Sequence, residues 1–464
     1  MTEDRDIPVI DTTEGKVSLY SKRETIHPRS IQGRFQRLRD LTVWLTMGGY
    51  MLGPWLRWDG SQAILFDIPA RQFQIFGITF WPQDFFLLAM LLMLLAFSLF
   101  FFTVLAGRVY CGYVCPQTTW TRFFTWIEEI TEGSRNKRFK LDDAPWSFNK
   151  ITRRGSKHAL WLLLALATGV TFVGYFTPIL ELIPRLFSFE LGRWEMIWIG
   201  FFTGATYLNA GWMREQVCIY MCPYARFQSV MFDRDTMIVS YDEGRGEPRG
   251  RGIKNRDEKG LGDCIDCELC VQVCPTGIDI RDGLQFECIT CAACIDACDQ
   301  VMDQVDKPRG LIRYTTENAL ENKPTKLARP RLLGYGAVLA VMLLVFSSAL
   351  LTRVPVGLDV MRDRGQLYRT ASTGQIENVY RLAVMNMSQD GYWFELRLDG
   401  PEGLNMRAPE RIFIDGGERA NVPVTLGYDP LDYEIDTQPV WFIVEAEENA
   451  RLHARRESRF IAPR

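Results

Sequence analysis

The chain has 464 residues, enough for two to four structural units, and its apolar residues are gathered in blocks, which indicates a membrane protein. The formal net charge of −3 tells little about partners, because the charged residues are sorted by loop. Only three histidines are present, His27, His158 and His453, so a bis-histidine haem or a facial-triad iron would use most of them. The cofactor chemistry therefore falls to the twelve cysteines.

The N-terminal segment, residues 1–40, is charged throughout and lacks the apolar core of a secretory signal. We expect it to stay uncleaved in the cytoplasm. It contains Ile26-His27-Pro28-Arg29, and a basic stretch with Arg34 and Arg37 precedes the first apolar block, where it would anchor a helix at an anionic membrane surface. His27 lies beside a proline, so we expect it to be exposed to solvent and not to bind a metal.

We expect five membrane spans in a helical bundle, because about 20 apolar residues cross roughly 30 Å of hydrocarbon. The first segment is short and is interrupted by glycines and Pro54, and the fourth carries Glu195 and Asn209. The other three are long and uncharged. In chain order the segments are residues 41–58, 85–106, 159–180, 194–212 and 332–352.

Lysine and arginine are distributed unevenly among the connecting loops. Residues 107–157 carry ten of them, whereas residues 59–84 carry only Arg71 and residues 181–193 only two. Since basic loops stay on the cytoplasmic side, the ten-charge loop is predicted to face the cytoplasm. Alternation then places the N-terminus and residues 241–330 inside and residues 353–464 in the periplasm.

The last segment, residues 353–464, changes from continuous to alternating apolar residues. Tyr380, Leu382 and Val384 share one face, and glycine and proline clusters such as residues 399–401 separate such runs. This pattern predicts an antiparallel, immunoglobulin-like β-sandwich. The segment has no cysteine, so no disulfide would stabilise it. We expect it to act in docking, with a purely structural plug as the alternative.

Eight cysteines form two runs with the spacing Cys-x2-Cys-x2-Cys-x3-Cys. Bacterial ferredoxins hold two [4Fe–4S] clusters with this spacing, and the fourth cysteine of each run crosses over to the other cluster. A zinc site or a disulfide scaffold is the alternative, but zinc usually uses two Cys-x2-Cys pairs. Asp299 replaces the proline that usually follows the last cysteine, which removes no ligand. The predicted ligand sets are Cys264, Cys267, Cys270 and Cys298 for one cluster, and Cys288, Cys291, Cys294 and Cys274 for the other.

The other four cysteines form an internal repeat. Cys111-Gly-Tyr-Val-Cys115-Pro follows the second span, and Cys218-Ile-Tyr-Met-Cys222-Pro follows the fourth. Residues four apart share a helix face, so each copy would present two thiols, and functional sites of membrane proteins often lie between repeated halves. Thiolates suit Cu(I), zinc or an iron–sulfur cluster. A copper or redox-active dithiol site is favoured, and another metal centre or buried packing cysteines stay open.

Together, the paired Cys-x3-Cys-Pro motifs, the doubled ferredoxin run, the fifth span and the outer β-sandwich resemble one family. This is the CcoG family, also called FixG or RdxA, polyferredoxin-like accessory proteins in the assembly of cbb3-type cytochrome oxidase. The likeness covers nearly the whole chain, including Ile26-His27-Pro28-Arg29. The core, from the second span to the second ferredoxin run, is also similar to NapH-type quinol-oxidising membrane ferredoxins, which lack the outer sandwich.

The resemblance implies a multi-domain protein of the bacterial inner membrane. The expected parts are a cytoplasmic segment (residues 1–40), a transmembrane bundle (41–240), a cytoplasmic ferredoxin-like domain with two [4Fe–4S] clusters (241–330), a last transmembrane helix (331–352) and a periplasmic immunoglobulin-like sandwich (353–464).

The resemblance also implies a cupric reductase that supplies Cu(I) to the oxidase. Copper would be the substrate ion, bound and reduced at Cys111, Cys115, Cys218 and Cys222. Expected partners are oxidase assembly factors or copper chaperones and transporters, an unidentified electron donor and membrane lipid, and a homodimer is left open. No basic recognition helix is evident, so no nucleic acid is expected. The alternatives are a quinol-oxidising subunit that feeds a partner reductase and a redox-responsive membrane regulator.

Overall fold

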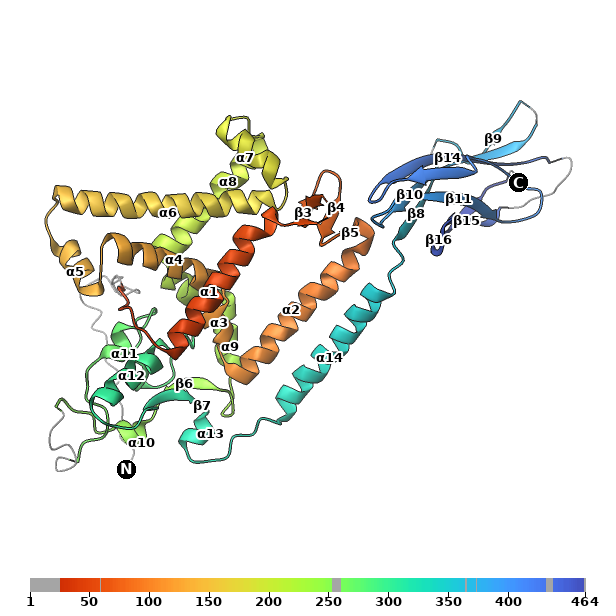
Figure 1. Cartoon of the computed structure of the whole chain (residues 1–464). Helices are drawn as coiled ribbons and strands as arrows, with labels where there is room; N and C mark the ends of the chain where they lie inside the picture. Colours follow the sequence, from red (N-terminus) through yellow and green to blue (C-terminus); the bar gives the residue numbers. More distant parts are fainter. Residues whose placement is uncertain are drawn as a thin grey trace, which may run out of the picture.

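The computed structural model describes residues 26–58, 60–252, 260–363, 365–372, 374–430 and 437–462. Figure 1 shows three parts in a row: a compact unit of short elements around α11 and α12, a set of long helices, and a β-sandwich. Two helices, α2 (Phe85–Ala106) and α14 (Pro330–Leu351), run side by side between the two ends. The chain runs along α2 away from the β-sandwich end and returns along α14 into the sandwich.

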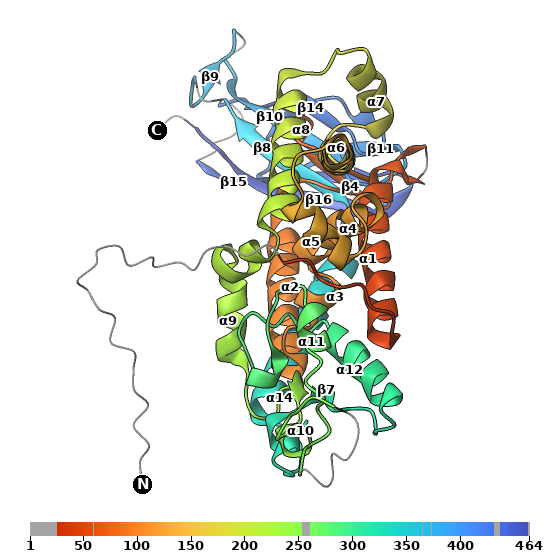
Figure 2. The same ribbon diagram turned by 90° about the vertical axis from the view of Figure 1, so that its left-hand side faces the viewer.

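Helices occur at all five predicted spans, but three of them are long and apolar enough to cross a membrane: α2 with the turn before it, α6 (Phe148–Gly174) and α14. The expectation of five clear spans is therefore not met. The helix α1 (Arg34–Leu52) begins with charged turns that lower its hydropathy. The helix α8 (Arg193–Thr206) has 14 residues and then changes to the π-helical segment η3 (Tyr207–Met213). Figure 2 views α6 along its axis while α2 and α8 run lengthwise, so α6 is inclined to both.

Short elements connect the long helices. The loop from α1 to α2 forms a small three-stranded sheet in the order β3-β4-β5 and a separate two-stranded one. Its elements are η1 (Gly53–Trp55), β1 (Arg57–Trp58), β2 (Ser61–Gln62), β3 (Ile64–Asp67), β4 (Gln72–Ile75), β5 (Ile78–Phe80) and η2 (Pro82–Asp84). The other connectors are α3 (Val109–Tyr113), α4 (Pro116–Thr131), α5 (Arg135–Asp143), α7 (Ile179–Phe187), η4 (Val217–Met221) and α9 (Pro223–Met231).

The compact unit is closed by an antiparallel strand pair. β6 (Ile238–Tyr241) pairs with β7 (Ile312–Thr315), so the unit begins before the boundary expected at residue 241. Apolar side chains and several cysteines share one core in it. Its other elements are α10 (Glu243–Gly246), α11 (Leu269–Gln272), η5 (Ile280–Asp282), α12 (Ala293–Gln304) and α13 (Glu317–Leu320).

The C-terminal part is a sandwich of two antiparallel sheets, as the alternating apolar pattern predicted. One sheet has the order β12-β14-β10-β8 with β9 paired to β10, and the other has the order β13-β11-β15-β16. Leu382, Val384 and Phe442 are fully buried between the sheets. The strands are β8 (Val356–Arg362), β9 (Arg369–Thr370), β10 (Ile376–Asn386), β11 (Tyr392–Asp399), β12 (Asn405–Arg407), β13 (Arg411–Ile414), β14 (Arg419–Tyr428), β15 (Gln438–Ala446) and β16 (Asn449–Phe460).

One contact joins α1 to the compact unit, and another joins the end of α14 to the start of α2. Asp296 of α12 accepts hydrogen bonds from the backbone N–H groups of Phe35 and Gln36, at 3.2 and 2.7 Å. This carboxylate thus caps the first turn of α1, where the helix dipole favours negative charge. At the opposite end Arg353, just after α14, pairs with Asp84, just before α2, at 2.6 Å.

Candidate metal centres

The eight ferredoxin cysteines line two small cavities in the compact unit. One cavity is lined by Cys264, Cys267, Cys270 and Cys298, and the other by Cys274, Cys288, Cys291 and Cys294, with Cys270 reaching both. The structure thus brings together the two predicted sets, including the crossover of the fourth cysteine of each run. Apolar residues such as Ile280 and Ile312 complete the walls.

The backbone around the cavities suits an anionic cluster. Asp266 and Glu268 in the first run, and Thr290 and Ala292 in the second, have φ between 53° and 60°, in the left-handed region that few such residues adopt. They occupy equivalent places, two and four residues after the first cysteine of each run. Alternation of right- and left-handed residues points successive N–H groups into a concave nest of the kind found at iron–sulfur sites. Thiols and backbone therefore both fit two [4Fe–4S] clusters, each of which would store one electron.

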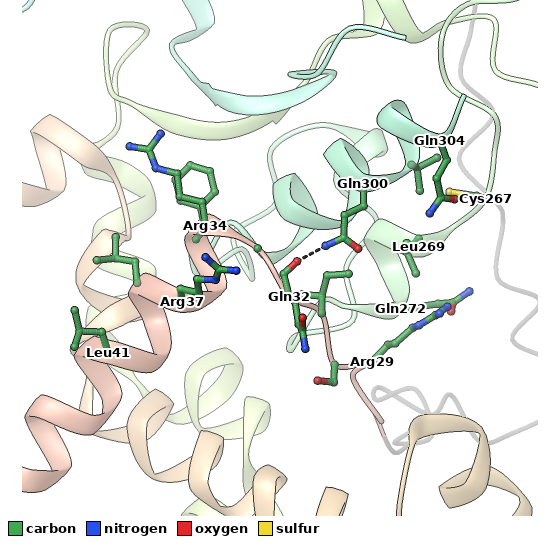
Figure 3. Close-up of a pocket in the computed structure, with 16 residues that line it drawn as sticks. Arg29, Gln32, Arg34, Arg37, Leu41, Cys267, Leu269, Gln272, Gln300 and Gln304 are labelled. Carbon is green, nitrogen blue, oxygen red and sulfur yellow. Dashed lines mark hydrogen bonds between the residues drawn. The ribbon is translucent and has the colours of Figure 1, made fainter. Parts of the chain in front are cut away.

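One of the two ligand sets reaches the surface. Cys267 is exposed and borders a groove of about 1320 Å³ between the N-terminal segment, α1 and the compact unit. Figure 3 shows Arg37 on α1 and Arg29 near Gln272, with the Gln300 amide between them donating to the Gln32 carbonyl. The other ligand set has no exposed member.

The four remaining thiols lie near one another, close enough for Cys115, Cys218 and Cys222 to affect the pKa of Cys111. Cys111 lies in α3 and Cys218 in η4, while Cys115 and Cys222 are the N-cap residues of α4 and α9, each followed by a proline at the first helical position. Both motifs close with the same wide turn: Cys115 N–H donates to the Tyr110 carbonyl at 2.9 Å, and Cys222 N–H donates to the Val217 carbonyl at 2.8 Å. The expectation of two α-helical pairs is thus corrected, because an i to i+5 turn holds each pair.

Two of these thiols, Cys111 and Cys218, are protonated at neutral pH in the metal-free protein. Burial raises the pKa of Cys111 to about 12, and the nearby Cys115, Cys218 and Cys222 add to the shift, although Arg108 opposes it. Burial likewise raises the pKa of Cys218 to about 12, with Cys115 as the next cause. A soft cation could displace the protons and bind the thiolates. Among the described residues, however, no three His, Cys, Asp or Glu side chains already converge on one ion position.

The four-thiol site touches the loop of the second cysteine run directly. A Cβ at Gly112 would lie 2.7 Å from the Ile289 carbonyl oxygen and 3.0 Å from Cys291 Cα, so only glycine fits there. The Tyr113 hydroxyl donates to the Cys291 carbonyl at 3.4 Å. Cys111 therefore sits beside the loop that holds Cys291.

A buried arginine joins the two sets of cysteines. Arg108 is 3% exposed and donates to the carbonyls of Phe286, before the second run, and Ala225, after the second Cys-Pro motif. Its charge acts on Cys111, Cys218, Cys222 and Cys288, while its burial lowers its own pKa. The role of Arg108 was not predicted, because an arginine after a membrane segment is an ordinary topology signal. The expectation that His27 is exposed to solvent was also wrong, since it is only 6% exposed.

Comparison with protein families agrees with this division of the chain. Residues 213–317 match the 4Fe-4S dicluster domain, residues 86–138 match a 4Fe-4S binding domain, and residues 346–463 match the Ig-like fold at the C-terminal of FixG. The first match contains both ferredoxin runs together with Cys218 and Cys222, and the second contains Cys111 and Cys115. The third supports the immunoglobulin-like description of the sandwich.

Individual relatives match most of the chain. Nitrogen fixation protein FixG of Rhizobium meliloti is 39% identical over 92% of this chain and 88% of its own length. Protein RdxA of Cereibacter sphaeroides is 42% identical over 88% of this chain and 87% of its own length, and RdxB of the same organism is 44% identical over 80% of each. A crystal structure of a FixG-related protein from Vibrio parahaemolyticus, 33% identical, aligns to 23% of this chain and 95% of its own with a TM-score of 0.22. On these relatives and on its cysteine pattern, the chain belongs to the FixG and RdxA family of iron–sulfur proteins.

Proposed function

We propose that this chain is an electron-transfer protein that reduces Cu(II) to Cu(I) for the assembly of a cbb3-type cytochrome oxidase. The dicluster domain supports the electron-transfer part, and membership in the FixG and RdxA family, whose resemblance implies oxidase assembly, supports the physiological role. The products would pass to oxidase assembly factors, copper chaperones or transporters. The observation that carries the copper step is the contact of the four-thiol site with the second cysteine run.

That contact gives the electron a short protein path. The backbone of Gly112 packs on the Ile289–Cys291 loop, and Cys111 follows the buried Arg108 by three residues. A cluster with four cysteine ligands has no open position for a copper ion, so copper needs ligands of its own. Cys111, Cys115, Cys218 and Cys222 offer soft thiolates, which stabilise Cu(I) over Cu(II) and so favour reduction.

The proposed location is the bacterial inner membrane, with the compact unit in the cytoplasm and the β-sandwich outside. In Figure 1, α1 and α14 start near the compact unit and end toward the sandwich, while α2 runs the opposite way. Apolar side chains on α1 and α8 are exposed, including Leu45 at 64% and Phe201 at 58%, as lipid-facing residues would be. These features support α1 and α8 as two further spans beside the three longer apolar helices.

The test separates copper ligands from cluster ligands. In protein purified without oxygen, the double variant Cys111→Ser/Cys115→Ser should lose Cu(I) binding and dithionite-driven Cu(II) reduction, while the iron content stays near eight per chain, as expected for two [4Fe–4S] clusters. The variant Cys288→Ser should instead lose iron. A wild-type content near twelve iron atoms that falls by about four in the double variant would make the four thiols ligands of a third cluster. Full copper reduction in the double variant would leave them as packing residues.

A further inference from the structure

A second polar site lies apart from the cysteines, between α4, α5, α6 and η3. It is a cavity of about 460 Å³, within the size range of small-molecule sites. On α6 it is bordered by Arg154, Lys157, His158 and Trp161, where the basic first turns of the helix give way to its apolar part. The cavity therefore lies at the level where a membrane would begin.

His27 gives this cavity an unused hydrogen-bonding group. The side chain is buried, and its Nε2 contacts Asp142 Oδ2 at 2.8 Å. In the part of the chain that the structure describes, Nδ1 is buried and has no hydrogen-bond partner. A buried polar nitrogen without a partner costs free energy, and the side chain that carries this one lines the cavity, so the site favours a ligand that donates a proton or a hydrogen bond to it.

The charges around the cavity favour a neutral ligand. Lys157 pairs with Glu132 at 2.8 Å, and Arg214 pairs with the buried Glu128. Although burial raises the pKa of Glu128, Arg214 and its other cationic neighbours outweigh it and hold the pKa below the ordinary value, so this carboxylate stays charged. The cavity wall holds four carboxylates, Glu128, Glu132, Asp142 and Glu215, and three cations, Arg154, Lys157 and Arg214. The buried Arg138, which also pairs with Glu128, balances the fourth carboxylate, so no excess negative charge is left to attract a copper ion.

The opening of the cavity borders an apolar, exposed surface. Trp161 and Trp212 line the cavity, and Trp212 is 57% exposed. Close by in the sequence, Leu160, Leu163 and Leu208 are 40%, 63% and 52% exposed. A ligand with a polar head and an apolar tail would satisfy both surfaces, because the head could reach His27 while the tail stays in lipid.

We propose that this cavity binds the head group of a membrane quinol and that this quinol is the electron donor of the protein. The quinol hydroxyl would donate to His27 Nδ1. Oxidation to the quinone releases two electrons, one to each of the two [4Fe–4S] clusters that the cysteine runs would hold, and two protons. The protons leave in succession through His27 and Asp142, whose side chain is 36% exposed. This proposal rests on the proposed function in one respect, that the two clusters accept the electrons.

The chain connects this cavity to the cysteine loops. Ile26, which borders the cavity, contacts Gly277 closely enough that a Cβ there would lie 2.8 Å from its side chain. The Arg29 N–H donates to the Gln272 carbonyl at 2.7 Å, two residues before Cys274. The segment that carries His27 is therefore attached directly to a cysteine run.

The test uses the full-length protein with its clusters, reduced with dithionite and then freed of it. Mixed with decylubiquinone, the wild type should show cluster oxidation, followed by absorbance, whose rate saturates with quinone concentration. In this reverse direction His27 would pass the proton back to the quinone, so His27→Gln should lower the saturating rate about 10²-fold, the order of a lost general acid. Its iron content and its oxidation by ferricyanide should be unchanged. The matched control His453→Gln alters an exposed histidine of the β-sandwich and should behave as the wild type.

A second readout reports binding without electron transfer. A photoreactive azidoquinone should label peptides that contain residues 26–28 or 154–161 in the wild type, and excess decylubiquinone should suppress the label. Oxidation that does not saturate, a wild-type rate in His27→Gln, or labelling elsewhere only would overturn the proposal. Dithionite-driven Cu(II) reduction by the same preparations tests the copper function separately, since it bypasses the quinol.

Discussion

At the scale of single residues, the motifs located the metal chemistry but not the residues that join its parts. The cysteine spacing predicted both ligand sets, because crossover ligation has a fixed pattern. Gly112 and Arg108 join the four-thiol site to the second run, yet their roles depend on contacts with Ile289 and Phe286, far away in the chain. No local pattern contains such contacts. His27 was misjudged for the same reason, since its burial comes from α5.

The glycine at the junction should be sensitive to a single added methyl group. In Gly112→Ala the new Cβ would meet backbone atoms of Ile289 and Cys291, so the two loops must move apart. We expect a loss of roughly 1–3 kcal/mol in stability and slower Cu(II) reduction, with iron content per folded chain unchanged. Thermal unfolding in detergent and dithionite-driven copper reduction would measure these. Gly155→Ala, where a Cβ meets nothing within 4 Å, is the matched control and should leave both unchanged or slightly improve stability.

The raised thiol pKa values predict how copper binding depends on pH. Burial, followed by neighbouring thiols, raises the pKa of Cys111 and of Cys218 to about 12, so both are protonated at neutral pH in the metal-free protein. Cu(I) must displace these protons, so its affinity should rise with pH between 6 and 8, about tenfold per pH unit for each proton released. Competition with a Cu(I) chelator, corrected for the chelator's own protonation, would measure this. An affinity independent of pH would mean that the thiols are already ionised.

At the scale of elements, continuous apolar runs predicted the long helices and alternating apolar runs predicted the strands of the sandwich. The segment 85–106 was predicted to the residue, and the strand around Phe394 follows the expected alternation, whereas the strand around Tyr380 is buried on both faces over its second half. The π-helical turns η3 and η4 could not be predicted, because propensity does not distinguish them from an α-helix and the packing of Gly211 on Trp161 helps to shape them. The beginning of β6 was missed because its partner β7 lies about 70 residues further on.

The ends of α2 and α14 should depend on one ion pair. Arg353 and Asp84 are each 10% exposed, and Arg353 also donates to the Thr79 carbonyl at 2.8 Å. Arg353→Met leaves the Asp84 carboxylate buried without its cation, which typically costs about 3–5 kcal/mol. We expect a lower unfolding temperature in detergent, whereas the exposed Arg381→Met on β10 should change it little. Equal effects of the two substitutions would show that the pair does not hold the helix ends together.

At the scale of the whole molecule, the position of each part follows from which surfaces must avoid water. The compact unit encloses its cysteines in an apolar core, and the sandwich encloses its own core. The helices between them enclose smaller apolar clusters, such as those around Val170 and Phe124, and α2 and α14 are almost wholly exposed over their most apolar windows. Such helices are long and apolar enough to cross a membrane. At the proposed location, lipid would cover them and the membrane would lie between the two enclosed units.

This arrangement predicts that the two enclosed units lie on opposite sides of the membrane. The basic loop 107–157 lies at the same end of the helices as the compact unit, and the positive-inside rule assigns that end to the cytoplasm. Reporter fusions after Thr352 should be active only in the periplasm, and fusions near Arg249 only in the cytoplasm. A fusion within residues 59–84 should report the periplasm if α1 crosses, and the cytoplasm if it does not. If the fusions after Thr352 and near Arg249 reported the same side, α14 would not cross the membrane, and the separation of electron transfer from the β-sandwich would have to be abandoned.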